Sequence, residues 1–121
     1  MRKIALIDDS KTFRVYARQI LEQEQYQVEE FNDAEVFFNV TKDFNEYALI
    51  ITDLHMPGMS GLTALENIRF NPITEKIPVL LITGKPSKDV VELAVRYKVN
   101  DFISKPFTSD VLLSRVNKIL K

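Results

Sequence analysis

The sequence predicts an α/β fold with a doubly wound parallel sheet, and three observations lead to this prediction. Strand-length apolar runs alternate with helical patterns along the whole chain, which is typical of a parallel α/β domain. The runs at residues 3–7, 48–52 and 78–83 are almost wholly apolar, as expected of strands that helices cover on both faces. The runs at 26–31 and 101–104 carry charged residues, which suits sheet edges. Together these features predict five strands in the order 2-1-3-4-5.

The bulk composition excludes several classes of protein. A length of 121 residues suits one domain, and we expect residues 1–121 to form it. The net charge of -1 argues against nucleic-acid binding driven by electrostatics. The chain has no cysteine, so disulfides and thiolate zinc sites are excluded. No apolar span is long enough for a signal peptide or a membrane helix, and we therefore expect a cytoplasmic protein without membrane insertion.

The first two helices follow the first two strands. A helix capped by Ser10 should follow residues 3–7, and its apolar stripe consists of Phe13, Ala17, Ile20 and Leu21. After the more polar strand at 26–31, a second helix should start near Asp33. Its apolar positions are Phe37, Val40 and Phe44.

Three further helices complete the alternation, and each has a hydroxyl residue that can cap it. Ser60 caps a helix that carries Leu65 and Ile68 and ends before Pro72. Ser87 caps the next helix, whose apolar positions are Val90, Ala94 and Tyr97. Thr108 or Ser109 caps the last helix, whose inner face consists of Leu112, Val116, Ile119 and Leu120.

Reactive polar groups stand at the ends of four of the predicted strands. They are Asp8 and Asp9 after residues 3–7, Asp53 after 48–52, Thr83 at the end of 78–83, and Lys105 after 101–104. The carboxyl ends of parallel strands meet at one edge of the sheet, and ligands bind there beside the strand where the order reverses. We therefore expect three carboxylates, a hydroxyl and an ammonium to converge on one point.

These residues can bind a hard metal ion and react with a phosphoryl group. Two carboxylates ~4 Å apart repel by roughly 4 kcal/mol at an effective dielectric of 20, and Lys105 offsets only one of the three charges. The site offers oxygen ligands and no thiolate, which favours Mg²⁺. Mn²⁺ is the second choice. Asp53 can act as a nucleophile that forms an acyl phosphate, while metal and ammonium neutralise the phosphoryl oxygens and Thr83 donates a hydrogen bond to one of them.

All three glycines follow the third and fourth strands, in the loops around this point. Gly58, Gly61 and Gly84 suit places where the backbone needs unusual angles or a close approach, although ordinary turns also explain them.

The segment from Asp53 to Gly61, with the sequence DLHMPGMSG, resembles the phosphoacceptor region of response-regulator receiver domains in two-component signalling. The pairs Asp8-Asp9 and Thr83-Gly84 and the run Lys105-Pro106-Phe107 match the other signatures of this family in order, and the resemblance covers essentially the whole chain. It implies a flavodoxin-like (βα)5 fold and a cis bond before Pro106.

The resemblance also implies the chemistry and the partners. Asp53 would accept a phosphoryl group from a sensor histidine kinase or a histidine phosphotransfer protein. Asp9, Asp53 and the backbone carbonyl of His55 would bind Mg²⁺, with Asp8 nearby through water. The side chains of His55 and Lys85 stand at positions that influence how fast the phosphoryl group is lost.

Signal transmission in the family uses the positions of Thr83 and Phe102. Thr83 moves toward the phosphoryl group and the aromatic ring follows, although Phe102 lacks the hydroxyl that many relatives have there. A downstream protein would bind the face formed by the fourth helix, the fifth strand and the fifth helix. On this face we expect Val91, Val95, Lys98, Asp101 and Ser104.

Three alternatives remain at this point. A phosphatase resembling the haloacid dehalogenases would need a second aspartate where His55 stands. A phosphorylation-independent binding module on the same fold usually lacks one of the acidic residues or the lysine, and this chain has them all. The chain is either a stand-alone receiver like the chemotaxis regulators or a receiver excised from a longer regulator or hybrid kinase. Met1 just before the first strand favours a free-standing or N-terminal domain.

Overall fold

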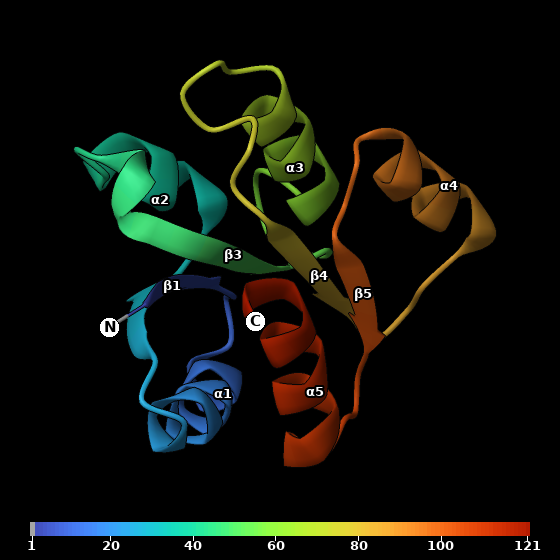
Figure 1. The fold of residues 1–121 in the computed structure, drawn as a ribbon. Coiled ribbons are helices and arrows are strands. Elements are labelled where there is room, and N and C mark those ends of the chain that lie inside the picture. The colour runs from blue at the N-terminus through green and yellow to red at the C-terminus, as the bar shows by residue number, and fades with distance from the viewer. Residues whose placement is uncertain (1) are drawn as a thin grey trace.

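A five-stranded parallel sheet with helices on both faces makes up the computed structural model, which describes residues 2–121 (Figure 1). The strands lie in the order β2-β1-β3-β4-β5. The strands are β1 (Lys3–Ile7), β2 (Gln27–Phe31), β3 (Tyr47–Asp53), β4 (Val79–Thr83) and β5 (Asp101–Ser104). The helices are α1 (Lys11–Gln23), α2 (Ala34–Val40), α3 (Gly61–Arg69), α4 (Lys88–Arg96) and α5 (Ser109–Leu120). The predicted fold class and strand order are confirmed.

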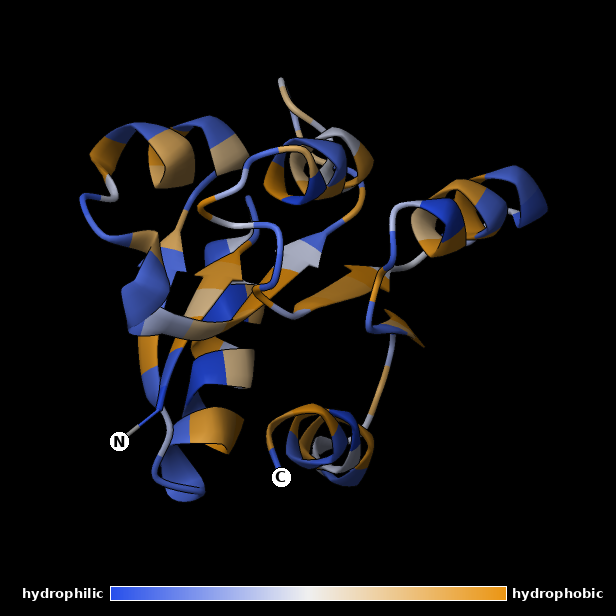
Figure 2. Ribbon diagram, turned by 45° about the horizontal axis from the view of Figure 1, so that its top comes forward, coloured by the Kyte–Doolittle hydropathy of each residue, from blue (hydrophilic) through white to orange (hydrophobic). Residues whose placement is uncertain are grey.

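Each face of the sheet has its own hydrophobic core. Alternate residues of a strand point to opposite faces, so Ala5 and Ile7 pack toward α2, α3 and α4, while Ile4 and Leu6 pack toward α1 and α5. β1, β3 and β4 are covered on both sides, which explains why their sequences are continuous apolar runs. Figure 2 shows the hydrophobic residues concentrated in the strands and on the inward faces of the helices.

Side-chain caps fix where the helices begin. In each case a side-chain oxygen accepts a hydrogen bond from the backbone N–H three residues later, which satisfies a donor that the helix itself leaves unpaired. The capping residues are Ser10, Asp33, Ser60, Ser87 and Thr108. Of the two candidates for α5, the structure selects Thr108.

The prediction that Phe44 belongs to the second helix is wrong. α2 ends at Val40, because Thr41 leaves the helical conformation and its hydroxyl donates a hydrogen bond to the carbonyl of Phe37 at 2.6 Å. Asp43 then caps a short 3₁₀ helix, Phe44–Glu46. Phe44 still reaches the same core, with its ring 5.6 Å from that of Phe37, whereas Val40 is exposed.

None of the helices within residues 2–121 has the length and apolar character that crossing a membrane requires.

Candidate functional site

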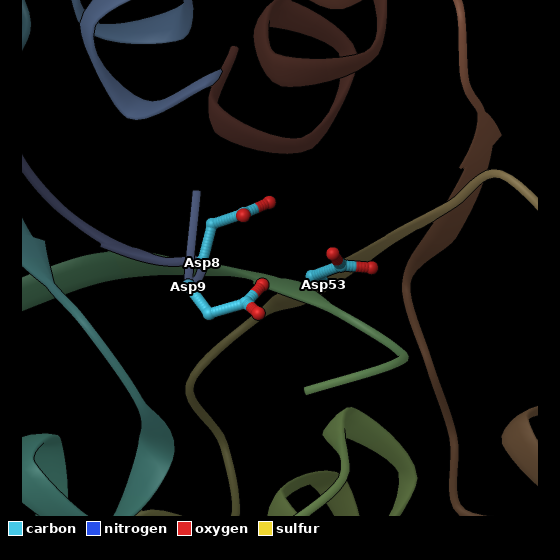
Figure 3. A group of neighbouring side chains, drawn as sticks. All are labelled: Asp8, Asp9 and Asp53. Carbon is cyan, nitrogen blue, oxygen red and sulfur yellow. The ribbon is translucent and has the colours of Figure 1, made fainter. Parts of the chain in front are cut away.

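Three carboxylates meet where β1 and β3 end. Asp8 and Asp9 directly follow β1, and Asp53 is the last residue of β3, the neighbouring strand in the sheet. One carboxylate oxygen from each residue lies within 4.8 Å of the others. Figure 3 shows the three side chains gathered at these strand ends. Asp8 and Asp53 are buried, while Asp9 is exposed to solvent.

Lys105 connects the two buried carboxylates. Its Nζ atom lies 3.0 Å from Oδ2 of Asp8 and 3.2 Å from Oδ2 of Asp53. The lysine follows β5, and the Lys105–Pro106 peptide bond is cis, as the family resemblance implied. The ammonium also lies 4.0 Å from the centre of the Phe13 ring, which is a favourable cation–π distance.

Burial and hydrogen bonding set the charge state of this pair. Burial raises the pKa of the Asp8 carboxyl, and this effect exceeds the lowering by the backbone N–H of Ser10, which donates to Oδ1 at 2.8 Å, and by Lys105. Burial would lower the pKa of Lys105, but the hydrogen bond to Asp8 and the charges of Asp8 and Asp53 outweigh it and raise the pKa. The ammonium is therefore held charged between two carboxylates.

The oxygen-rich donor set fits a magnesium ion. Asp8, Asp9 and Asp53 bring three carboxylates together against a single ammonium, and Asp9 makes no ion pair with any other residue in the described part of the chain. Closely spaced carboxylates repel strongly when they are partly shielded from water, and a divalent cation offsets that repulsion. Mg²⁺ prefers a few carboxylate oxygens and retains several waters, which suits a cluster with one exposed member.

Thr83 stands beside this cluster, at the buried end of β4. Its hydroxyl oxygen accepts a hydrogen bond from the backbone N–H of Lys85 at 3.1 Å, which leaves the hydroxyl proton to donate elsewhere. A depression of about 500 Å³ opens over Asp53, and its other lining residues are His55, Gly84 and Lys85. The carboxylate of Asp53 is therefore reachable from solvent between two loops that carry basic side chains.

The loop after β3 is packed tightly against Asp53. The backbone N–H of Gly61 donates to the carbonyl of Leu54 at 2.9 Å, and a Cβ atom added to Gly61 would lie 2.1 Å from the carbonyl oxygen of Asp53. Only glycine permits this approach. The backbone N–H of His55 donates to Oδ1 of Asp53 at 3.3 Å, so the loop also orients the carboxylate.

The predicted site residues divide into two groups. Asp8, Asp9, Asp53 and Lys105 come together as expected, with Thr83 at the next strand end. Phe102 lies farther away and half-buried, in register with Leu81 and packed against the core under α3 and α4. Since Thr83 is two residues beyond Leu81, Thr83 and Phe102 lie on the same face of the sheet.

Two residues contribute to the site although their sequence pattern predicted only structural roles. Phe13 was expected in the apolar stripe of the first helix, yet its ring packs on the ammonium of Lys105. Ser10 was expected as a helix cap, and it also donates its backbone N–H to Asp8. Phe13 and Lys105 are separated by 91 residues in the sequence, so no local pattern predicted their contact.

These features are those expected of a receiver domain of two-component signalling, and comparison with known proteins confirms the family. The family model "Response regulator receiver domain" matches residues 4–117, so the chain belongs to this family. The protein "Chemotaxis protein CheY-3" of Vibrio cholerae is 31% identical, over 98% of this chain and 92% of that protein.

Two further comparisons match the chain to part of a much longer sensor kinase and to a solved receiver domain. The "CAI-1 autoinducer sensor kinase/phosphatase CqsS" of Vibrio cholerae is 34% identical, over 95% of this chain but only 17% of that protein. The crystal structure of a signal receiver domain of a two-component histidine kinase from Clostridium thermocellum has a TM-score of 0.89 at 30% identity, with 99% and 98% of the two chains covered. The family thus includes both single-domain and multidomain relatives of this chain.

Proposed function

We propose that this receiver acts as a phosphorylation-dependent signalling switch, with Asp53 as the phosphoacceptor. The observation that carries the proposal is the position of Lys105, whose ammonium joins Asp53 to Asp8 below an open depression. A nucleophilic carboxylate needs a charge partner that stabilises the incoming phosphoryl oxygens, and the lysine stands where it can serve this purpose.

Asp9, Asp53 and the backbone carbonyl of His55 would hold Mg²⁺, with Asp8 bound through water. When bound, the ion would neutralise phosphoryl oxygens and the repulsion among the carboxylates. Mn²⁺ has the same ligand preferences and is expected to substitute.

The transfer itself is a displacement at phosphorus. An oxygen of Asp53 attacks a phosphohistidine of a sensor histidine kinase or a histidine phosphotransfer protein. The new O–P bond makes an acyl phosphate while the N–P bond breaks and the departing imidazole takes a proton. Lys105 keeps its proton throughout and pairs with a phosphoryl oxygen, and the Thr83 hydroxyl donates a hydrogen bond to another.

Output would follow from Thr83 and Phe102, which share one face of the sheet. Movement of Thr83 toward the phosphoryl group would leave space for the Phe102 ring to turn inward and alter the face formed by α4, β5 and α5, where a downstream protein binds. Val95, Lys98 and Ser104 are exposed on this face, whereas Val91 and Asp101 are half-buried. Asp101 is held by Arg115 at 3.0 Å.

Labelling with a small phosphodonor tests the proposal. Acetyl phosphate with Mg²⁺ should add one phosphoryl group to the wild-type protein, observed as a mass increase that chelation of the metal prevents. The variant Asp53→Asn should remain unlabelled. Equal labelling of the two proteins, or none of the wild type, would contradict the assignment. Steady release of phosphate from a phosphomonoester would instead support the phosphatase alternative, which the exposed, non-acidic His55 does not favour.

A further inference from the structure

A groove of about 360 Å³ lies between the C-terminal ends of α3 and α4, away from the site around Asp53. Both helices begin after the carboxyl ends of their strands and return along the sheet, so their last turns lie at its opposite edge (Figure 1). Four cationic side chains and a single carboxylate line the groove: Arg69, Lys76, Arg96, Lys98 and Glu75.

Arg69 is a partly buried cation without a charged partner. Its guanidinium donates to the backbone carbonyls of Ile77 at 2.7 Å, Lys98 at 3.0 Å and Glu75 at 3.1 Å, and to the side-chain oxygen of Asn100 at 3.0 Å. These acceptors are neutral, and burial lowers the pKa of the guanidinium. Hydrogen bonding is therefore satisfied while the positive charge is not compensated, which leaves a positive potential in the groove.

The cations at the rim add to this potential. Lys76, Arg96 and Lys98 are exposed, and within residues 2–121 none of them forms an ion pair. By contrast, the cations beside β2 each contact a glutamate at 2.8–3.0 Å. Together with Arg69, four cations that form no ion pair within residues 2–121 therefore line this one groove.

Apolar side chains are exposed at the same end. Phe70, Val95 and Ile73 have exposed fractions of 73%, 65% and 61%, the highest of the large hydrophobic residues in the described part of the chain. The ring of Phe70 lies 6.1 Å from that of Tyr97 in an edge-on arrangement, and both rings line the groove. Exposed apolar surface that is surrounded by charge is typical of an interaction site.

Charge and size restrict the occupant. A second copy bound through a two-fold axis would place the same cations opposite one another, which is repulsive. Nucleic acid is disfavoured because the chain as a whole has a net charge of -1. A small anion would leave Phe70 uncovered. An acidic peptide with an apolar side chain satisfies both the charge and the exposed rings.

We propose that the groove between α3 and α4 docks a short acidic segment of a partner protein, with an apolar side chain of that segment seated on Phe70 and Tyr97. The site is distinct from the phosphoacceptor centre, and it shares only Lys98 with the residues named on the face of α4, β5 and α5. Docking therefore does not require phosphorylation of Asp53.

Selection from a library of random short peptides on the wild-type protein tests this proposal. Binders should combine acidic residues with an aromatic or aliphatic residue. A synthetic peptide of the selected sequence should shift the backbone amide NMR signals of residues 69–76 and 95–98. The double variant Lys76→Glu with Arg96→Glu should weaken binding of this peptide by about tenfold or more, because each new carboxylate repels the acidic peptide. Selection of non-acidic peptides, or shifts confined to other residues, would overturn the proposal.

Matched variants distinguish docking in the groove from a general attraction between opposite charges. Lys88→Glu with Lys118→Glu changes the net charge equally, at exposed positions outside the groove, and should leave affinity unchanged. Asp53→Asn should also bind normally, so failure of the phosphorylation proposal would not affect this one. Equal weakening by both double variants would show attraction to net charge alone and overturn the proposal. Concentration-dependent dimers that Lys76→Glu with Arg96→Glu abolishes would reassign the groove to a second copy.

Discussion

α1 and α4 flank opposite ends of the sheet and are held to it very differently. α1 buries Ala17, Ile20 and Leu21, and its arginines form ion pairs with β2. α4 buries only Ala94, and within residues 2–121 it forms no ion pair with other elements. The firmly held helix adjoins the carboxylate cluster, whereas the loosely held helix adjoins the proposed output face. Regions with few buried contacts open at low free-energy cost, so we expect α4 to be displaced from the sheet more easily than α1.

The largest expected effect comes from the tight backbone contact between Gly61, at the start of α3, and Asp53. In Gly61→Ala the new Cβ would meet the carbonyl oxygen of Asp53 at 2.1 Å, so the backbone must move. We expect a loss of about 3 kcal/mol in the free energy of unfolding, measured by urea denaturation.

Gly84→Ala is the matched change on the loop that leads toward α4. A Cβ there would have Lys105 Cβ at 3.9 Å as its nearest neighbour, which is ordinary contact. We expect stability within about 0.5 kcal/mol of wild type. Equal destabilisation by Gly61→Ala and Gly84→Ala would contradict the expectation that the backbone is packed more tightly at Gly61 than at Gly84.

The ion pairs of α1 predict a pH-dependent difference. Burial alone would raise the pKa of Glu30, but hydrogen bonds from Arg18 and Arg14 outweigh it, so the pKa lies below its usual value of 4.5. A lowered carboxyl pKa stabilises the fold above the unfolded-state pKa, and this contribution is lost as the pH falls through the folded-state pKa. Glu30→Gln should therefore cost about 1 kcal/mol near neutral pH and become neutral in strong acid.

Urea denaturation near neutral pH and in strong acid measures this difference. Glu92→Gln on α4 serves as the control, since Glu92 is exposed and forms no ion pair within the described residues, and it should behave like wild type at both. A pH-independent effect of Glu30→Gln would show that the ion pairs with α1 do not hold the helix.

The sequence predicted the features that depend on local chemistry. Helix starts followed from single capping residues such as Ser87, and the carboxylate cluster followed from the rule that parallel strands end at one edge. The end of α2 could not be predicted, because the hydroxyl of Thr41 competes with the helix for the Phe37 carbonyl and apolar spacing does not report this. The hydrogen bonds of Arg69 to distant carbonyls likewise depend on how the loops fold back.

The contact between Phe13 and Lys105 has the smallest expected effect, and it tests whether α1 contributes to the chemistry or only to packing. The ring lies 4.0 Å from the ammonium that joins Asp8 and Asp53. A partly exposed cation–π contact contributes about 0.5–1 kcal/mol, so Phe13→Leu should slow labelling of Asp53 by acetyl phosphate about two- to fivefold. Leucine keeps an apolar side chain against the core, and stability should change little.

Two variants make this measurement specific. Phe13→Tyr retains an aromatic face and should restore the wild-type rate, which a purely structural role of the ring would not require. Tyr16→Phe removes the hydroxyl that donates to the Phe107 carbonyl at 3.2 Å but leaves the ring beside that loop. If Tyr16→Phe slows labelling as much as Phe13→Leu does, the loop after β5 rather than the cation–π contact positions Lys105. If neither change alters the rate, the two carboxylates alone are sufficient to position the ammonium, and the rigidity of α1 serves the fold but not the transfer.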